Sequence, residues 1–148
     1  MGITIHYRGR LSPKVKRKEF FAYAKVLCAE HKWKIEGEES EFHILPHENC
    51  ELLNFRLAGD GSFQDTCKTQ FATIEIHIRI VDFFSNLKLK LTELVIRDEG
   101  EYWELRNKER LARQLGNCFD EIRKTMDENP DYYGPVRSDD GRIVDLVK

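Results

Sequence analysis

Apolar and polar residues alternate at the start of the chain and then change to a helical spacing. Ile3, Ile5 and Tyr7 fall on one side of an extended segment, with polar residues between them, which predicts a strand with one buried face. Ser12 and Pro13 then form a typical helix start. The apolar stripe that follows predicts a surface helix over residues 13–31, and its members are Phe20, Phe21, Ala24, Leu27, Cys28 and His31.

Short alternating segments follow this helix. They predict strands at residues 33–36, 42–44 and 53–57, with a return strand beginning at Phe63. The glycines of the intervening "AGDGS" segment are typical of a tight turn. Because these strands are close together in sequence, we expect them to pair as antiparallel hairpins.

The most apolar stretch, residues 71–87, fits two patterns. Its isoleucines alternate with polar residues, as in a strand: Ile74, Ile76, Ile78 and Ile80. Its polar residues also recur at spacings of four, three and four, as along one side of a helix: Glu75, Arg79, Asp82 and Asn86. The polar stripe favours a largely buried helix, although β-branched residues are more typical of strands.

The last third of the chain predicts a strand, a helix and a tail. Leu94 to Arg97 alternate as a strand, and Asn107 is placed to cap a helix. The apolar stripe of that helix comprises Leu111, Leu115, Cys118, Phe119, Ile122 and Met126. Residues 127–148 are rich in Gly, Pro and Asp, so this tail either adds an edge strand or stays disordered.

The order of these elements predicts an α+β fold. We expect an antiparallel or mixed sheet of about five strands, with two or three helices packed mainly on one face. Residues 1–126 would form one domain, followed by the tail. The apolar end of the tail makes a homodimer through this segment one of the alternatives.

Composition narrows the class of protein. The chain of 148 residues is 41% hydrophobic and 34% charged, as in one globular domain. It has no apolar run long enough for a membrane span and no secretory pattern at its start, so a cytoplasmic location without membrane contact is expected. The net charge is −2 and the one basic run is short, which argues against a nucleic-acid partner. The four cysteines form no C-x-x-C pair and are expected to be free thiols.

Catalytic signatures for phosphate, dinucleotide, zinc or serine chemistry are missing from the sequence. The first weak candidate is Cys67, which precedes the predicted helix at 71–87 and could pair with His77 as a nucleophile and base. The alternative is that Thr66 or Thr69 caps this helix and that Cys67 packs in the core.

Two further groups of polar residues are candidates for binding. The segment "DEGEYWE" places carboxylates beside two aromatic residues, an arrangement that could hold a cation or supply an acid and a base. Its alternative is a charged turn whose aromatic residues fold back over the core. His6 and Arg8, on the polar side of the first strand, either line a cleft or lie beneath a helix with partners. Without a companion histidine motif, no metal and no cofactor are predicted.

Three motifs together resemble a family of small, mostly bacterial proteins of unknown function. They are "GITIHYRGRL", "CKTQFA" leading into "IHIRIVDFF", and "DEGEYWEL". The resemblance implies a bacterial cytoplasmic protein and a helix after Gln70. It supplies no activity and no catalytic residues.

We therefore expect a cytoplasmic binding or interaction module whose partner is a small molecule or a protein. Its predicted ligand surface comprises Lys68, Gln70, Asp98, Glu99, Glu101, Tyr102, Trp103, His6 and Arg8. One alternative is a small enzyme that depends on Cys67, with His77, or on the carboxylates. Another is an immunity or regulatory subunit that acts through a protein partner.

Overall fold

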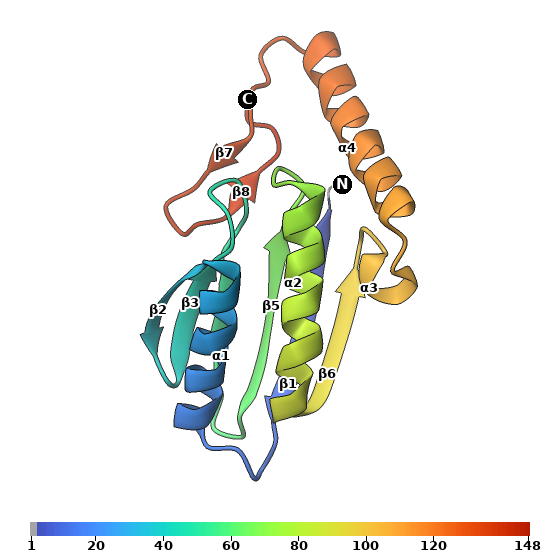
Figure 1. Ribbon diagram of the computed structural model, residues 1–148. Coiled ribbons are helices and arrows are strands. Elements are labelled where there is room, and N and C mark those ends of the chain that lie inside the picture. The colour runs from blue at the N-terminus through green and yellow to red at the C-terminus, as the bar shows by residue number, and fades with distance from the viewer. Residues whose placement is uncertain (1–2) are drawn as a thin grey trace.

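The computed structural model describes residues 3–148 and confirms the α+β class (Figure 1). Its elements, in chain order, are β1 (Thr4–Leu11), α1 (Arg17–His31), β2 (Lys34–Glu38), β3 (Glu41–Leu45), β4 (Leu53–Arg56), β5 (Ser62–Lys68), α2 (Ile74–Leu87), the 3-10 turn η1 (Lys88–Lys90), β6 (Leu91–Asp98), α3 (Tyr102–Leu105), α4 (Lys108–Glu128), β7 (Val136–Arg137) and β8 (Ile143–Val144). The start of the predicted domain, at residues 1 and 2, lies outside the described residues.

The strands form two small antiparallel sheets and a hairpin, rather than the single sheet of about five strands that we predicted. One sheet has the order β5-β1-β6 and the other the order β2-β3-β4, while β7 and β8 form a separate two-stranded sheet. The described residues form four α-helices, and not two or three. Both α1 and α2 lie against the same side of the two sheets (Figure 1).

Strand β1 has one buried face (the inner face) and one solvent-exposed face (the outer face), as its alternation predicts. Ile5 and Tyr7 are at most 2% exposed, whereas Arg8 and Arg10 are exposed. The inner face packs into an aromatic core that helices α1 and α2 complete. The fully buried rings of this core are Tyr7, Phe20, Phe42, Phe55, Phe83 and Phe84. Because these two helices lie on one side of the sheets, the outer face of β5-β1-β6 is exposed to solvent.

Helix α2 confirms the helical interpretation of the isoleucine-rich stretch. All four residues of its predicted polar stripe are exposed, while Ile80, Val81 and Phe84 are buried. Its N-cap is Thr73, whose side chain accepts a hydrogen bond from the backbone N–H of Ile76. Thr66 and Thr69 are therefore not the cap, because β5 continues through Lys68 before the chain turns.

Two other helix boundaries test the sequence patterns. Asn107 caps α4 as predicted, accepting a hydrogen bond from the backbone N–H of Arg110 at 3.0 Å. Helix α1, in contrast, begins at Arg17 rather than at residue 13. The preceding residues form a turn, closed by a 3.0 Å bond from the Val15 N–H to the Ser12 carbonyl.

The two sheets lie side by side but are parted between β4 and β5. Among residues 3–148, backbone bonds join them at two places, from the Glu51 N–H to the Lys68 carbonyl at 3.1 Å and from the Ala58 N–H to the Ser62 carbonyl at 2.8 Å. Between these points the Tyr7 hydroxyl donates to the Asn54 carbonyl at 2.9 Å and accepts from the Asn54 N–H at 2.8 Å. We call this interruption the inter-sheet opening.

The tail closes the other side of the inter-sheet opening. Its hairpin brings Arg142 against β5, where Nη1 donates to the Thr66 carbonyl at 2.7 Å. Residues 127–148 thus finish α4 and form a small hairpin that docks on the loop before β4. The single sheet is interrupted because one tyrosine and one arginine side chain take the hydrogen-bonding places that a continuous ladder would use.

The inter-sheet opening yields a test of stability. Tyr7→Phe should lower the free energy of unfolding by about 2 to 3 kcal/mol, because it leaves the buried N–H and C=O of Asn54 without a partner. Urea denaturation followed by circular dichroism measures this change. As a control, Tyr23→Phe removes a hydroxyl that donates to the Asn86 carbonyl at 3.3 Å on the surface, and should change stability by less than about 0.5 kcal/mol. Equal effects of the two substitutions would contradict the role of Tyr7.

Candidate functional site

A broad groove lies on the open face of the β5-β1-β6 sheet. Its volume is about 690 Å³, and it is lined by His6, Tyr7, Arg8, Gln64, Asp65, Thr66, Val95 and Arg97. The register of the strands produces this set, because His6 lies opposite both Thr66 and Arg97, and Arg8 lies opposite Gln64 and Val95. Strand pairing thus collects on one surface polar residues that are far apart in the sequence.

The groove contains two arginines and one carboxylate, Asp65, which is paired with Arg142 of the tail. Within residues 3–148, neither Arg8 nor Arg97 makes an ion pair, and both side chains belong to exposed residues. His6 differs, because its Nε2 lies 3.1 Å from the Glu99 carboxylate, which also accepts the Thr4 N–H at 3.0 Å. The two guanidinium groups therefore make this face a site for negative charge.

Only part of the predicted ligand surface lies on this face. His6 and Arg8 line the groove, and Glu99 adjoins it through His6. Lys68 shares the outer face, where its Nζ bonds to Asp145 of the tail at 2.8 Å. Five residues lie elsewhere: Gln70 and Asp98 are buried, and Glu101, Tyr102 and Trp103 surround the start of α3.

The buried residues His77 and Asp98 form a polar network with Thr69. His77 Nε2 lies 2.8 Å from Asp98 Oδ2, and His77 Nδ1 lies 2.6 Å from the Thr69 hydroxyl. The arrangement has the order of a hydroxyl–imidazole–carboxylate triad. These residues are at most 3% exposed, however, so no substrate can reach the hydroxyl. The network instead ties α2 to the end of β6 and to α3.

Asp98 also fixes the backbone conformation of the segment after β6. Its carboxylate accepts the backbone N–H groups of Gly100, Tyr102 and Trp103 at 2.7 to 3.1 Å. Burial alone would raise the pKa of Asp98, but the hydrogen bond and charge of His77 and the backbone N–H groups lower it below the ordinary value. The "DEGEYW" segment is thus a turn organised around a buried carboxylate, with its aromatic residues half-buried.

Gln70 likewise uses a side-chain oxygen to accept a backbone N–H, here just before the start of β1. Its Oε1 accepts the backbone N–H of Ile3 at 2.6 Å, while its Nε2 is buried without a hydrogen-bond partner among the described residues. Glu101 is paired with Arg110 on the surface. Neither residue faces the groove.

Cys67 and His77, the predicted catalytic pair, belong to separate networks. Both ring nitrogens of His77 are occupied by Thr69 and Asp98. The Cys67 thiol is fully buried, lies 3.6 Å from the Cys50 sulfur and donates to the Glu51 carbonyl at 3.3 Å. A hydrogen bond with Cys50, together with burial, raises the pKa of Cys67 well above its ordinary value, which opposes its use as a thiolate nucleophile.

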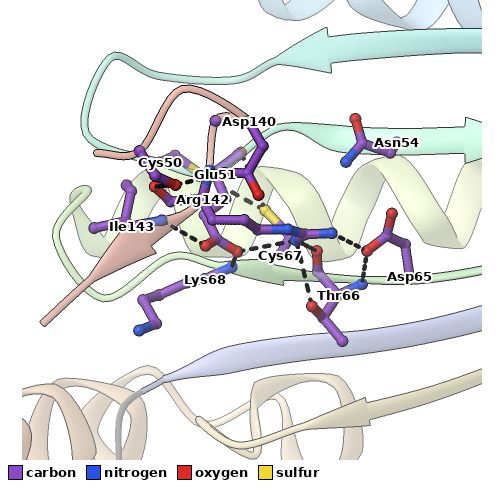
Figure 2. Close-up of polar contacts among 12 residues, drawn as sticks. Cys50, Glu51, Asn54, Asp65, Thr66, Cys67, Lys68, Asp140, Arg142 and Ile143 are labelled. Atoms are coloured by element: carbon purple, nitrogen blue, oxygen red, sulfur yellow. Dashed lines mark hydrogen bonds and ion pairs between the residues drawn. The ribbon is translucent and has the colours of Figure 1, made fainter. Parts of the chain in front are cut away.

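A second polar cluster, which the sequence did not predict, holds the tail in place (Figure 2). The Arg142 guanidinium bonds to Asp65 and lies 3.2 Å from Glu51 Oε1, while Glu51 Oε2 accepts the Ile143 N–H at 2.7 Å. Glu51 is only 4% exposed, so its charge requires these partners. No sequence pattern links Arg142 to Asp65 or Glu51, because they are separated by more than seventy positions.

Sequence reasoning missed Arg97 among the groove residues, together with Gln64, Asp65, Thr66 and Val95. Arg97 occupies the polar side of β6, as Arg8 does on β1, and the alternation of both strands was visible. Finding the pair required knowing that β6 lies next to β1.

Within the described chain, no group of three or more His, Cys, Asp or Glu side chains is arranged so that it could hold a metal ion.

The Asp98 network predicts a pH-dependent stability. Asp98→Asn should destabilise the protein by about 3 kcal/mol at pH 7, because it breaks a buried hydrogen-bonded carboxylate network. The folded pKa lies below the ordinary 3.8, so the stabilisation is present above this value and is lost as the pH falls through the folded pKa. The difference between wild type and variant in urea melts should thus shrink from pH 7 to pH 3.

Asp82→Asn is the matched control, because Asp82 is an exposed carboxylate of α2 that lies 3.9 Å from Arg106. It should change stability by less than about 0.5 kcal/mol at either pH. A constant deficit of Asp98→Asn across this range would show that its carboxylate does not titrate with a lowered pKa.

Comparison of the chain with known proteins gives no match that bears on its function. No protein-family model matches it, and no curated protein and no solved structure gives a significant match. The resemblance to a family of small bacterial proteins thus stays a prediction. In residues 3–148, no helix combines the length and the apolar character that crossing a membrane requires.

Proposed function

We propose that the protein is a binding module whose open sheet face takes a small anionic ligand. The observation that carries this proposal is the pair of guanidinium groups, Arg8 and Arg97, which line one groove and make no ion pair among residues 3–148. The carboxylate of the same groove, Asp65, is bonded to Arg142 of the tail. Arginine binds phosphate and carboxylate groups through two parallel hydrogen bonds. The ligand would therefore present such a group to each arginine or share one group between them.

The rest of the groove supports a small molecule rather than a long polymer. About 690 Å³ is within the usual range for sites of drug-sized ligands. Gln64 and Thr66 supply hydrogen-bonding side chains on β5, and Val95 supplies an apolar patch beside the arginines. The aromatic residue among those that line the groove, Tyr7, has its ring buried against Phe55 and Phe84. It is therefore not free to stack on a base, which favours an anionic metabolite over single-stranded nucleic acid.

The contacts of the sulfur and imidazole groups favour binding over catalysis. Cys67 and His77 are both fully buried and have separate partners. In the groove, Thr66 has the only hydroxyl besides Tyr7, and the Tyr7 hydroxyl is bonded to Asn54 on the opposite side of the sheet. A cysteine-dependent enzyme is therefore less well supported than a binding module.

A thermal-shift titration with pyrophosphate, citrate and AMP tests the proposal. An anion that binds should stabilise the folded protein by about 2.7 kcal/mol at a hundred times its dissociation constant. Arg8→Ala and Arg97→Ala should each weaken that binding about tenfold or more, because each removes a charge-assisted contact. Isothermal titration calorimetry with the best anion gives the dissociation constants.

Arg10→Ala is the matched control, since Arg10 lies on the same strand and face but outside the groove, 3.9 Å from Glu93. It removes the same charge and should leave the affinity within about twofold. The proposal fails if no anion of the panel stabilises the protein, or if Arg10→Ala weakens binding as much as the two groove variants.

A further inference from the structure

Two cysteines face each other across one end of the inter-sheet opening. Cys50 precedes β4 and Cys67 belongs to β5, and their sulfur atoms lie 3.6 Å apart. Both side chains are fully buried. The sulfurs are in contact but not bonded, and a disulfide would require them to approach to about 2.05 Å.

The backbone around the pair already aligns the two segments. The Glu51 N–H donates to the Lys68 carbonyl at 3.1 Å, and the Cys67 thiol donates to the Glu51 carbonyl at 3.3 Å. Residues 50–51, in the loop before β4, are therefore neighbours of residues 67–68 at the end of β5. Closing the remaining distance between the sulfurs requires rotation of side chains and a small shift of the loop that holds Cys50.

The tail hairpin covers this loop. Arg137 Nη2 donates to the Cys50 carbonyl at 2.8 Å, and Arg142 and the Ile143 N–H hold the Glu51 carboxylate. Figure 2 shows the hairpin lying over Cys50 and Glu51, with Arg142 reaching across to β5. We call these contacts of Arg137, Arg142 and Ile143 the tail clasp.

We propose that Cys50 and Cys67 form a reversible disulfide that links the two sheets, and that the tail clasp controls access to it. In this reaction the two thiols lose two protons and two electrons, and one sulfur–sulfur bond forms. The oxidant is of the diazene, peroxide or disulfide class and takes up both electrons. With diamide, one sulfur adds to the nitrogen–nitrogen double bond, and the second sulfur displaces the hydrazine product.

The chemistry explains why the pair needs a gate. Burial and the mutual hydrogen bond hold the pKa of Cys67 well above its ordinary value, so the closed protein contains little thiolate. Local opening of the tail clasp would expose the pair to solvent and to the oxidant. Once formed, the bond would join the loop before β4 covalently to β5 at an end of the inter-sheet opening, where hydrogen bonds now join them.

Peptide mapping of the native wild-type protein tests the disulfide directly. The protein is incubated with diamide under native conditions, then unfolded in urea with N-ethylmaleimide to block its remaining thiols, and digested with trypsin without reduction. Cys50 and Cys67 fall on separate peptides, residues 35–56 and 57–68. The expected product is these two peptides joined, with a mass about 2 Da below their sum, and it should disappear after treatment with dithiothreitol.

The other cysteines are internal controls. Cys28 is buried in α1, and Cys118 is half-buried in α4. Both should be recovered blocked with N-ethylmaleimide. The proposal is overturned if Cys50 and Cys67 are also recovered as blocked thiols, if they are joined to Cys28 or Cys118 instead, or if the joined peptide forms only in urea.

The gate is tested by the rate of that reaction. Arg142→Ala should speed formation of the joined peptide about tenfold or more, because the tail clasp then opens at lower cost. Arg123→Ala, in an exposed position of α4, is the control and should leave the rate unchanged. Circular dichroism verifies that Arg142→Ala is folded, and Arg137→Ala serves as a second variant of the same clasp if it is not. A rate equal to that of wild type in a folded clasp variant would overturn the gating role.

Discussion

The structure depends on how the inter-sheet opening between β4 and β5 satisfies its backbone groups. Buried N–H and C=O groups without partners are costly, and here side chains provide the partners. The Tyr7 hydroxyl serves Asn54 on one side, and the Arg142 guanidinium serves Thr66 on the other. Burial, with Cys67 and Asp65 nearby, raises the pKa of Tyr7 well above its ordinary value, so its hydroxyl keeps the proton that it donates. We call these contacts of Tyr7 with Asn54 and of Arg142 with Thr66 the junction, because they connect the two sheets and the tail.

The candidate sites follow from this junction and from the one-sided coverage by helices. Tyr7 points inward from β1, so its neighbours His6 and Arg8 point outward into the groove. Helices α1 and α2 bury the inner face of the β5-β1-β6 sheet and leave its outer face exposed (Figure 1). Arg8 and Arg97 both lie on this outer face. At the end of the same opening, the loop before β4 brings Cys50 to Cys67. The proposed anion site and the proposed disulfide thus lie in different regions of one scaffold.

The sequence predicted the features that depend on local periodicity. The alternation of β1 and the polar stripe of α2 give the correct buried faces, because each follows from residues close together in the chain. The sequence did not predict the junction, since Tyr7 and Asn54 are 47 positions apart and no periodic pattern records their contact. Gln70 and Asp98 were assigned to the surface as polar residues, yet both are buried because backbone N–H groups satisfy their oxygens.

Native-state hydrogen exchange at the Asn54 amide tests the role of the junction most directly. This N–H has no backbone partner within the described residues and donates to the Tyr7 hydroxyl instead. If that hydroxyl holds the two sheets together, the amide should exchange as slowly as the strand-paired amides of β3 and β4, through openings close to global unfolding. Exchange as fast as that of the exposed turn at Gly59 and Asp60 would contradict the account.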